Sequence, residues 1–108
     1  MEIGYKHIAD LAACIDIPQD GVLSRVLHKD GHLNAVIFAF DAGQELSEHT
    51  ASIPAIIQIV KGDARLTLGE EVFDAHPGTW AHMPANLKHS IYANTPVVML
   101  LLMLKCKD

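Results

Sequence analysis

Three of the seven histidines are the residues in this sequence best placed to do chemistry. His49, His82 and His89 lie within or beside short apolar segments typical of β-strands, whose alternate side chains can enter the interior of a barrel. The other four belong to a predicted N-terminal helix or flank turns: His7, His28, His32 and His76. Neutral imidazoles that converge from several strands are common ligands of divalent metals. The three strand histidines therefore predict a binding site, with or without a metal.

Gln58 and Trp80 complete the candidate pocket. Gln58 interrupts an Ile- and Val-rich strand, and its amide oxygen could be a third metal ligand. If Ala55 faces the interior, however, strand alternation turns Gln58 outward toward a neighbouring strand or subunit, unless a bulge shifts the register. Trp80 lies two residues before His82 and shares its face, as core or as an aromatic wall for a ligand. His82 is either a pocket residue or a half-buried histidine bonded to backbone.

The sequence offers no nucleophile and no phosphate-binding loop. No Ser or Cys stands beside a His in a recognisable catalytic arrangement, and the glycines are scattered turn residues. Glu48 neighbours His49 on the same strand and therefore points to the opposite face, and Glu45 is no better placed as a general base. Hydrolase and nucleotidase functions are not supported.

Turn residues divide the chain after Pro18 into short segments, which predict the elements that position these side chains. Gly and Pro recur every 6 to 14 residues, and the intervening segments are rich in Val, Ile, Leu, Phe and Thr. About nine or ten strands are expected, among them residues 22–28, 33–40, 55–61, 64–68, 79–83, 90–93 and a final apolar strand. Strand edges in so short a chain are best satisfied by an all-β barrel or two-sheet jelly roll.

One short amphipathic helix is expected over residues 6–14, because Ile8, Leu11 and Ile15 recur at helical spacing. We therefore divide the chain into a helix and lead-in over residues 1–20 and a single barrel domain over residues 21–106.

Composition excludes several classes of partner. The chain has 108 residues, of which 50% are hydrophobic and 19% charged, enough apolar material for one core. A net charge of −5 without charge runs gives no surface for nucleic acid or anionic lipid. The most apolar run, residues 96–104, is about half the length of a membrane-spanning helix, and the N-terminus lacks an uninterrupted signal-like core. We expect a cytoplasmic protein whose Cys14 and Cys106 are reduced.

Two sets of residues share a distinctive spacing: Gly43, His49 and Gly62 in the first, and Gly78, Pro84 and His89 in the second. Five residues separate the first glycine from its histidine, and five separate the second glycine from its proline. This arrangement resembles the two motifs of the cupin superfamily, over roughly residues 22–105. It looks closest to small single-domain bacterial cupins with "EHT" and "MPA" signatures, for which a fold is known but usually no reaction. The resemblance implies a cupin double-stranded β-helix, or jelly-roll barrel, preceded by one short helix.

Four positions depart from the cupin pattern: Ala51 replaces a His, Ala55 a Glu, Asn86 a Gly and Ala93 an Asn. The change at Asn86 is benign, because Asn tolerates positive φ. Alanine offers no ligand, so the resemblance implies metal-ligand positions only at His49 and His89. Two imidazoles bind a divalent ion weakly, and His82 or Gln58 would have to be the third ligand of Zn, Ni, Mn or Fe.

Two functions from different classes remain open, beside a third, a structural or regulatory dimer similar to the sensing half of cupin-type regulators, which would need a separate partner because no helix-turn-helix segment is attached here. In the first, the barrel binds a small organic ligand through His49, Gln58, Trp80, His82 and His89, with a weak or unusual divalent-metal site. In the alternative, the chain is a metal-dependent cupin enzyme of dioxygenase or isomerase type that uses His49 and His89. The alanines favour the first. The ligand, and whether any catalysis takes place, are not decided by the sequence. A homodimer is expected, because residues 22–40 and the last strand are more apolar than one small barrel readily covers.

Overall fold

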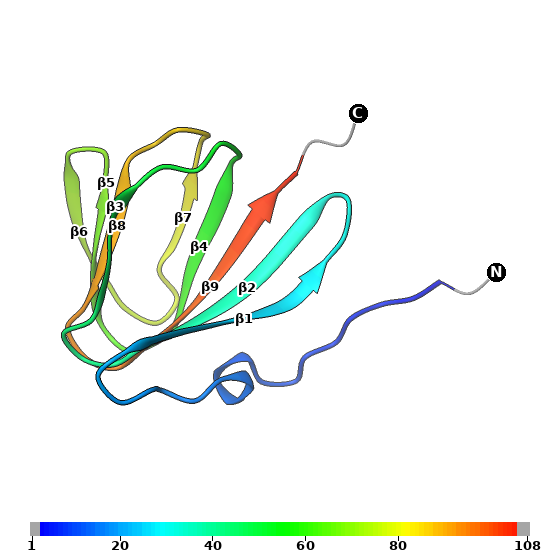
Figure 1. Cartoon of the computed structure of the whole chain (residues 1–108), viewed down its shortest axis with the longest axis horizontal. Coiled ribbons are helices and arrows are strands. Elements are labelled where there is room, and N and C mark those ends of the chain that lie inside the picture. Colours follow the sequence, from blue (N-terminus) through cyan, green and yellow to red (C-terminus); the bar gives the residue numbers. More distant parts are fainter. Residues whose placement is uncertain (1–2, 106–108) are drawn as a thin grey trace.

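The computed structural model describes residues 3–105, which form nine β-strands in two antiparallel sheets (Figure 1). One sheet has five strands in the order β1-β2-β9-β4-β7, and the other has four in the order β3-β8-β5-β6. The strands are β1 (Val22–Lys29), β2 (Leu33–Phe40), β3 (Glu45–His49), β4 (Ala55–Lys61), β5 (Ala64–Leu68), β6 (Glu71–Ala75), β7 (Trp80–Met83), β8 (His89–Ala93) and β9 (Val97–Leu104). The prediction of an all-β jelly-roll barrel is confirmed.

The core lies between the two sheets and follows from strand alternation. On β4, Ala55, Ile57 and Ile59 are buried and face the four-stranded sheet, while the residues between them face the other way. The core is completed by apolar side chains of β2, β5, β8 and β9, among them Phe40, Leu66, Ile91, Val97 and Met99. This interior is continuous with the hollow that contains the candidate site.

The predicted N-terminal helix is present only as a single 3₁₀ turn, η1 (Leu11–Cys14). The side chain of Asp10 accepts a hydrogen bond from the backbone N–H of Ala12 and starts the turn, and Ile15 returns to an extended conformation. None of the four η1 residues is buried. A short helix with so little buried surface does not offset the cost of nucleation, which explains why the helix expected over residues 6–14 does not form.

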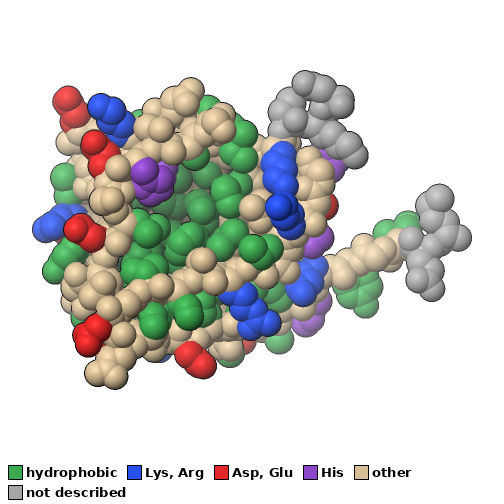
Figure 2. Space-filling model, viewed as in Figure 1, with side chains coloured by type: hydrophobic (Ala, Val, Ile, Leu, Met, Phe, Trp, Pro, Cys, Tyr) green, Lys and Arg blue, Asp and Glu red, His purple; other side chains and the backbone are tan. Residues whose placement is uncertain are grey.

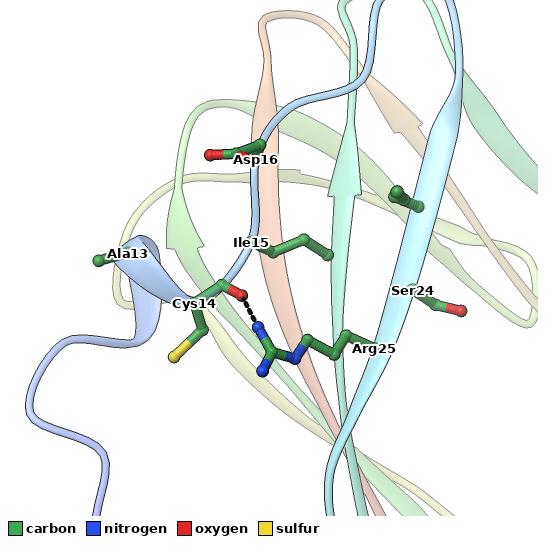
Figure 3. Close-up of a pocket in the computed structure, with 7 residues that line it drawn as sticks. Ala13, Cys14, Ile15, Asp16, Ser24 and Arg25 are labelled. Carbon is green, nitrogen blue, oxygen red and sulfur yellow. Dashed lines mark hydrogen bonds between the residues drawn. The ribbon is translucent and has the colours of Figure 1, made fainter.

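The N-terminal lead-in lies against the outer face of the five-stranded sheet. In Figure 3, Arg25 reaches from β1 toward Cys14, and its Nη1 donates a hydrogen bond of 2.9 Å to the Cys14 carbonyl. η1 also contacts β4. Residues of β2 and β9 that face outward, Ile37 and Val98, are accordingly almost fully buried.

Within the described residues, no helix is both long and apolar enough to cross a membrane. The end of the predicted barrel domain at residue 106, and the thiol of Cys106, lie outside the part of the chain that the structure describes. The division at residue 20 stays a prediction.

Candidate functional site

His49 and His89 come together inside the fold. They are register partners on the neighbouring strands β3 and β8, their ring centroids lie 4.2 Å apart, and the ring planes are tilted by 60°. Forty positions of sequence separate two imidazoles that are in contact in space. The predicted convergence of these two residues is therefore present in the structure.

A β-bulge in β3 aims His49 inward. Leu46 pairs with Ile91 and His49 pairs with His89, so three steps along β3 match two steps along β8. In a regular strand, two residues three apart would point to opposite faces. The extra residue changes that alternation, and both Leu46 and His49 line the same cavity.

Hydrogen bonds to the backbone fix both rings in the same way. Nδ1 of His49 lies 2.7 Å from the Ser47 carbonyl oxygen, and Nδ1 of His89 lies 2.9 Å from the Leu87 carbonyl oxygen. A carbonyl can only accept, so each Nδ1 carries the proton and donates it. In the neutral imidazole Nε2 then keeps its lone pair. Two rings with such a nitrogen therefore lie in contact, with their centroids 4.2 Å apart.

The two histidines belong to an otherwise apolar cavity between the sheets. It encloses about 50 Å³ and is lined by Phe38, Leu46, His49, Ile57, His89, Ser90, Ile91, Met99 and Leu101. His89 is nearly buried, with 9% of its surface exposed, whereas His49 is exposed at the mouth. Figure 2 shows this face of the molecule hollowed, with hydrophobic side chains across the hollow and a histidine at its rim.

Gln58, Trp80 and His82 do not line this cavity, and the expectation that they share a pocket with the histidine pair is corrected. The β4–β7 register is regular and pairs Gln58 with Trp80 and Ile56 with His82. These four residues face away from the interior, opposite to Ala55 and Ile57. Trp80 is 58% exposed and His82 is also exposed. Neither Gln58 nor His82 can be the third ligand of a metal held by His49 and His89.

The positions where cupin motifs carry further ligands are apolar. Ala55 is 3% exposed and faces the interior, with Met83 and Met103 as its register partners. Ala51 supplies only its carbonyl, which accepts from the backbone N–H of Asn86. Asn86 has a φ of 69°, the conformation expected for it. No group of three or more His, Cys, Asp or Glu side chains among residues 3–105 could hold a metal. The side chains at the site therefore do not provide enough ligands for the protein alone to hold a metal.

Sequence reasoning missed one polar residue of the interior, Asn34 on β2. It has the same strand parity as Val36 and Phe38 and faces inward. Its Oδ1 is buried and has no hydrogen-bond partner among the described residues. The signal in the sequence was a lone amide in the apolar segment LNAVIFAF, at the parity of the core residues.

Comparisons with known proteins agree with this architecture. Residues 36–104 match the family model described as "Cupin domain". A conserved protein of unknown function from Streptococcus pyogenes is 32% identical, with a TM-score of 0.85 over 98% of this chain and 93% of that one. A cupin superfamily protein from Desulfitobacterium hafniense is 24% identical, with a TM-score of 0.86 over 96% and 95% of the two chains. KdgF from a Halomonas species is 22% identical, with a TM-score of 0.77 over 87% and 88%. No curated protein matches the chain.

Proposed function

The chain belongs to the cupin family, and we propose that it binds a small organic ligand between its two sheets, with His49 and His89 as the polar contacts. The observation that carries this proposal is the pair of Nε2 lone pairs at an otherwise apolar cavity. Small-molecule sites are mostly apolar and contain a few polar groups that fix the orientation of the ligand. The arrangement has both properties.

The cavity limits how much of the ligand is enclosed. About 50 Å³ accommodates only a small group, since a single water needs roughly 10–15 Å³ by the same measure. The enclosed group would reach the nearly buried His89, and the rest of the ligand would extend past His49 into the open hollow. Activities of structural neighbours such as KdgF do not carry over, because a likeness at 22% identity supports the fold alone.

Ligand-induced thermal stabilisation tests this proposal. A panel of small organic compounds would be screened in the presence of EDTA against the wild type, the double variant His49→Ala/His89→Ala, and His82→Ala as the control. A ligand at 100 times its Kd stabilises a protein by about 2.7 kcal/mol. We expect compounds that stabilise the wild type and His82→Ala but not the double variant. Equal stabilisation of all three proteins would refute the site.

A divalent ion between His49 and His89 is the second candidate, because both rings are oriented as metal-ligating histidines are, with Nδ1–H donated to a carbonyl. Such an ion, among Zn, Ni, Mn and Fe, would need water or ligand oxygens at its other positions. This is the arrangement that a dioxygenase- or isomerase-type cupin enzyme would require. Ala51 and Ala55 weigh against tight retention of the ion.

Elemental analysis of untagged protein after gel filtration separates the two candidates. Near-stoichiometric metal in the wild type that disappears in His49→Ala/His89→Ala would favour the enzyme. Metal-free protein that still binds an organic compound would favour the binding module.

Two further proposals concern partners and location. A homodimer is supported by the edge strand β1, where Val22, Leu23 and Val26 are 37%, 40% and 56% exposed. Nucleic acid and membranes are not expected partners, given the net charge of −5. The cytoplasmic location stays a prediction.

A further inference from the structure

Among residues 3–105, the side chains that line the cavity around the histidine pair offer hydrogen-bond acceptors but no donor. Six of its nine lining residues carry only hydrocarbon or thioether side chains: Phe38, Leu46, Ile57, Ile91, Met99 and Leu101. Ser90 lies between the inward-facing residues His89 and Ile91, so strand alternation turns its hydroxyl to the opposite face. No Lys, Arg, Asn or Gln is among the nine. The remaining polar groups are the two imidazoles.

While it is neutral, each imidazole can accept a hydrogen bond from a ligand but cannot donate one. Its Nδ1–H is already donated to a backbone carbonyl, of Ser47 for His49 and of Leu87 for His89. Nε2 therefore offers a lone pair and no proton. A ligand that is to be held here has to bring the donor itself.

On the basis of the proposed function, we infer that this site selects neutral compounds that bear a hydroxyl donor on an apolar body, such as phenols, and rejects carboxylates and phosphates. A carboxylate brings acceptors and a negative charge into a cavity of acceptors and hydrocarbon. Burying a charge without a partner is strongly unfavourable. A phenol brings one O–H donor and a ring that matches the apolar wall.

The spacing of the pair favours a ligand with two neighbouring hydroxyls. With ring centroids 4.2 Å apart, both imidazoles lie within reach of adjacent donors on one small ring. One hydroxyl would meet the nearly buried His89 and the other would meet His49 at the mouth. Catechol should therefore bind more tightly than phenol, which satisfies one imidazole and leaves the other to water.

Binding of phenol, catechol and benzoate would be measured by ligand-observed NMR and calorimetry at pH 8, where neutral imidazole is the ordinary form of histidine. EDTA would be present, and catechol samples would be kept free of oxygen. We expect phenol to bind at least about tenfold more tightly than benzoate, a difference of about 1.4 kcal/mol. The variant His49→Ala/His89→Ala should lose this preference.

Exchanging the acceptor at the mouth for a donor should reverse the selectivity. His49 is exposed, so His49→Lys introduces an ammonium group at the cavity without burying it fully. This variant should prefer benzoate to phenol, and His49→Gln, which adds an uncharged amide donor, should shift the preference in the same direction. His82→Lys makes the same change on the outer face and should leave the preference as in the wild type.

The outcomes distinguish this inference from the function on which it rests. If the wild type binds benzoate more tightly than phenol, and does so through the two histidines, the inference fails while a ligand site at His49 and His89 stands. If no compound in this series or in the wider panel responds to His49→Ala/His89→Ala, both fail. Circular dichroism of each variant would verify that it is folded.

Discussion

At the scale of single residues, the site combines two imidazoles with very different surroundings. His89 is nearly buried among apolar side chains, and His49 stands exposed at the mouth, yet both donate Nδ1–H to the carbonyl two residues before them. Because each ring makes this hydrogen bond to its own strand, the chain itself fixes the orientation of both rings before any ligand binds. A preorganised pair of acceptors costs little to reorganise on binding.

Asn34 provides a test of how much an unpaired polar group in the interior lowers the stability of the fold. Its buried Oδ1 lacks a hydrogen-bond partner among residues 3–105, and an unsatisfied buried acceptor costs about 1–3 kcal/mol. Asn34→Leu should therefore raise the free energy of unfolding by about 1 kcal/mol in denaturant titrations. Asn94→Leu, at an exposed position, is the control and should change it little. Destabilisation by Asn34→Leu would mean that the amide is paired in solution.

Residue spacing predicted that His49 and His89 meet, as they do in the structure, whereas the other three pocket candidates lie on the outer face. Gln58 lies outward because the β4–β7 register is regular, as strand parity from Ala55 had indicated. His82 and Trp80 follow the same parity through their pairing with Ile56 and Gln58. Which strands pair is a long-range property, and the sequence around Trp80 contains no sign of it.

At the scale of elements, the turns hold the strands in the register that the site needs. Gly62, between β4 and β5, has a φ of +85°, and a Cβ built on it would lie 1.9 Å from the carbonyl oxygen of Pro96. The turn therefore packs directly on the chain that enters β9. Glycine is required there both by backbone conformation and by space.

Gly62→Ala should destabilise the protein by more than about 2 kcal/mol, because strain at positive φ is added to a backbone clash. Gly78→Ala is a matched comparison: its φ is +97°, but a Cβ there would meet nothing within 4 Å. We expect the second substitution to cost clearly less in chemical denaturation. A similar loss of stability in both variants would show that the close approach of Gly62 to Pro96 does not contribute to the effect.

The β1–β2 turn predicts a pH dependence. The pKa of Asp30 is held far below its usual value, first by the hydrogen bond from His28 and then by the backbone N–H groups of His32 and Leu33. A carboxyl whose pKa is lower in the folded state than in the unfolded state stabilises the fold when it is ionised. This contribution to the free energy of unfolding is complete at pH values above the unfolded pKa of 3.8 and is lost as the pH falls below it.

Asp30→Asn removes this titration. The wild type should be more stable than the variant at pH 6, and the difference should shrink as the pH is lowered from about 5 toward 2. Urea unfolding at a series of pH values measures it. A difference that stays constant with pH would contradict the assigned role of Asp30.

At the scale of elements, the positions of the strands could be predicted from the sequence, but the bulge in β3 and the extent of the N-terminal helix could not. Strand positions followed from turn residues and alternation, and segments such as residues 33–40 and 55–61 have the predicted bounds. The bulge in β3 left no mark in the sequence, although it is what places Leu46 and His49 on one side. The helical spacing of Ile8, Leu11 and Ile15 was a weaker guide, because too little apolar surface is buried there to support more than a 3₁₀ turn.

At the scale of the whole molecule, the fold class could be predicted from the spacing of the turn residues and from the two cupin-like motifs. Assembly depends instead on surfaces that are exposed in the monomer. If β1 provides the dimer interface, Val26→Lys should yield monomers in size exclusion with light scattering. Val72→Lys on β6 is a matched control, since the two valines are 56% and 59% exposed. A wild type that elutes as a monomer, or dimers in both variants, would contradict this interface.

The most direct test of the central claim is a long-range ¹H–¹⁵N NMR spectrum of the histidine rings, assigned with His49→Ala and His89→Ala. Both rings should be in the Nδ1–H form, and both Nε2 signals should shift when catechol is added, while that of His82 should not. Protons on Nε2 of the neutral rings, or Nε2 signals that do not respond to any bound ligand, would contradict the account.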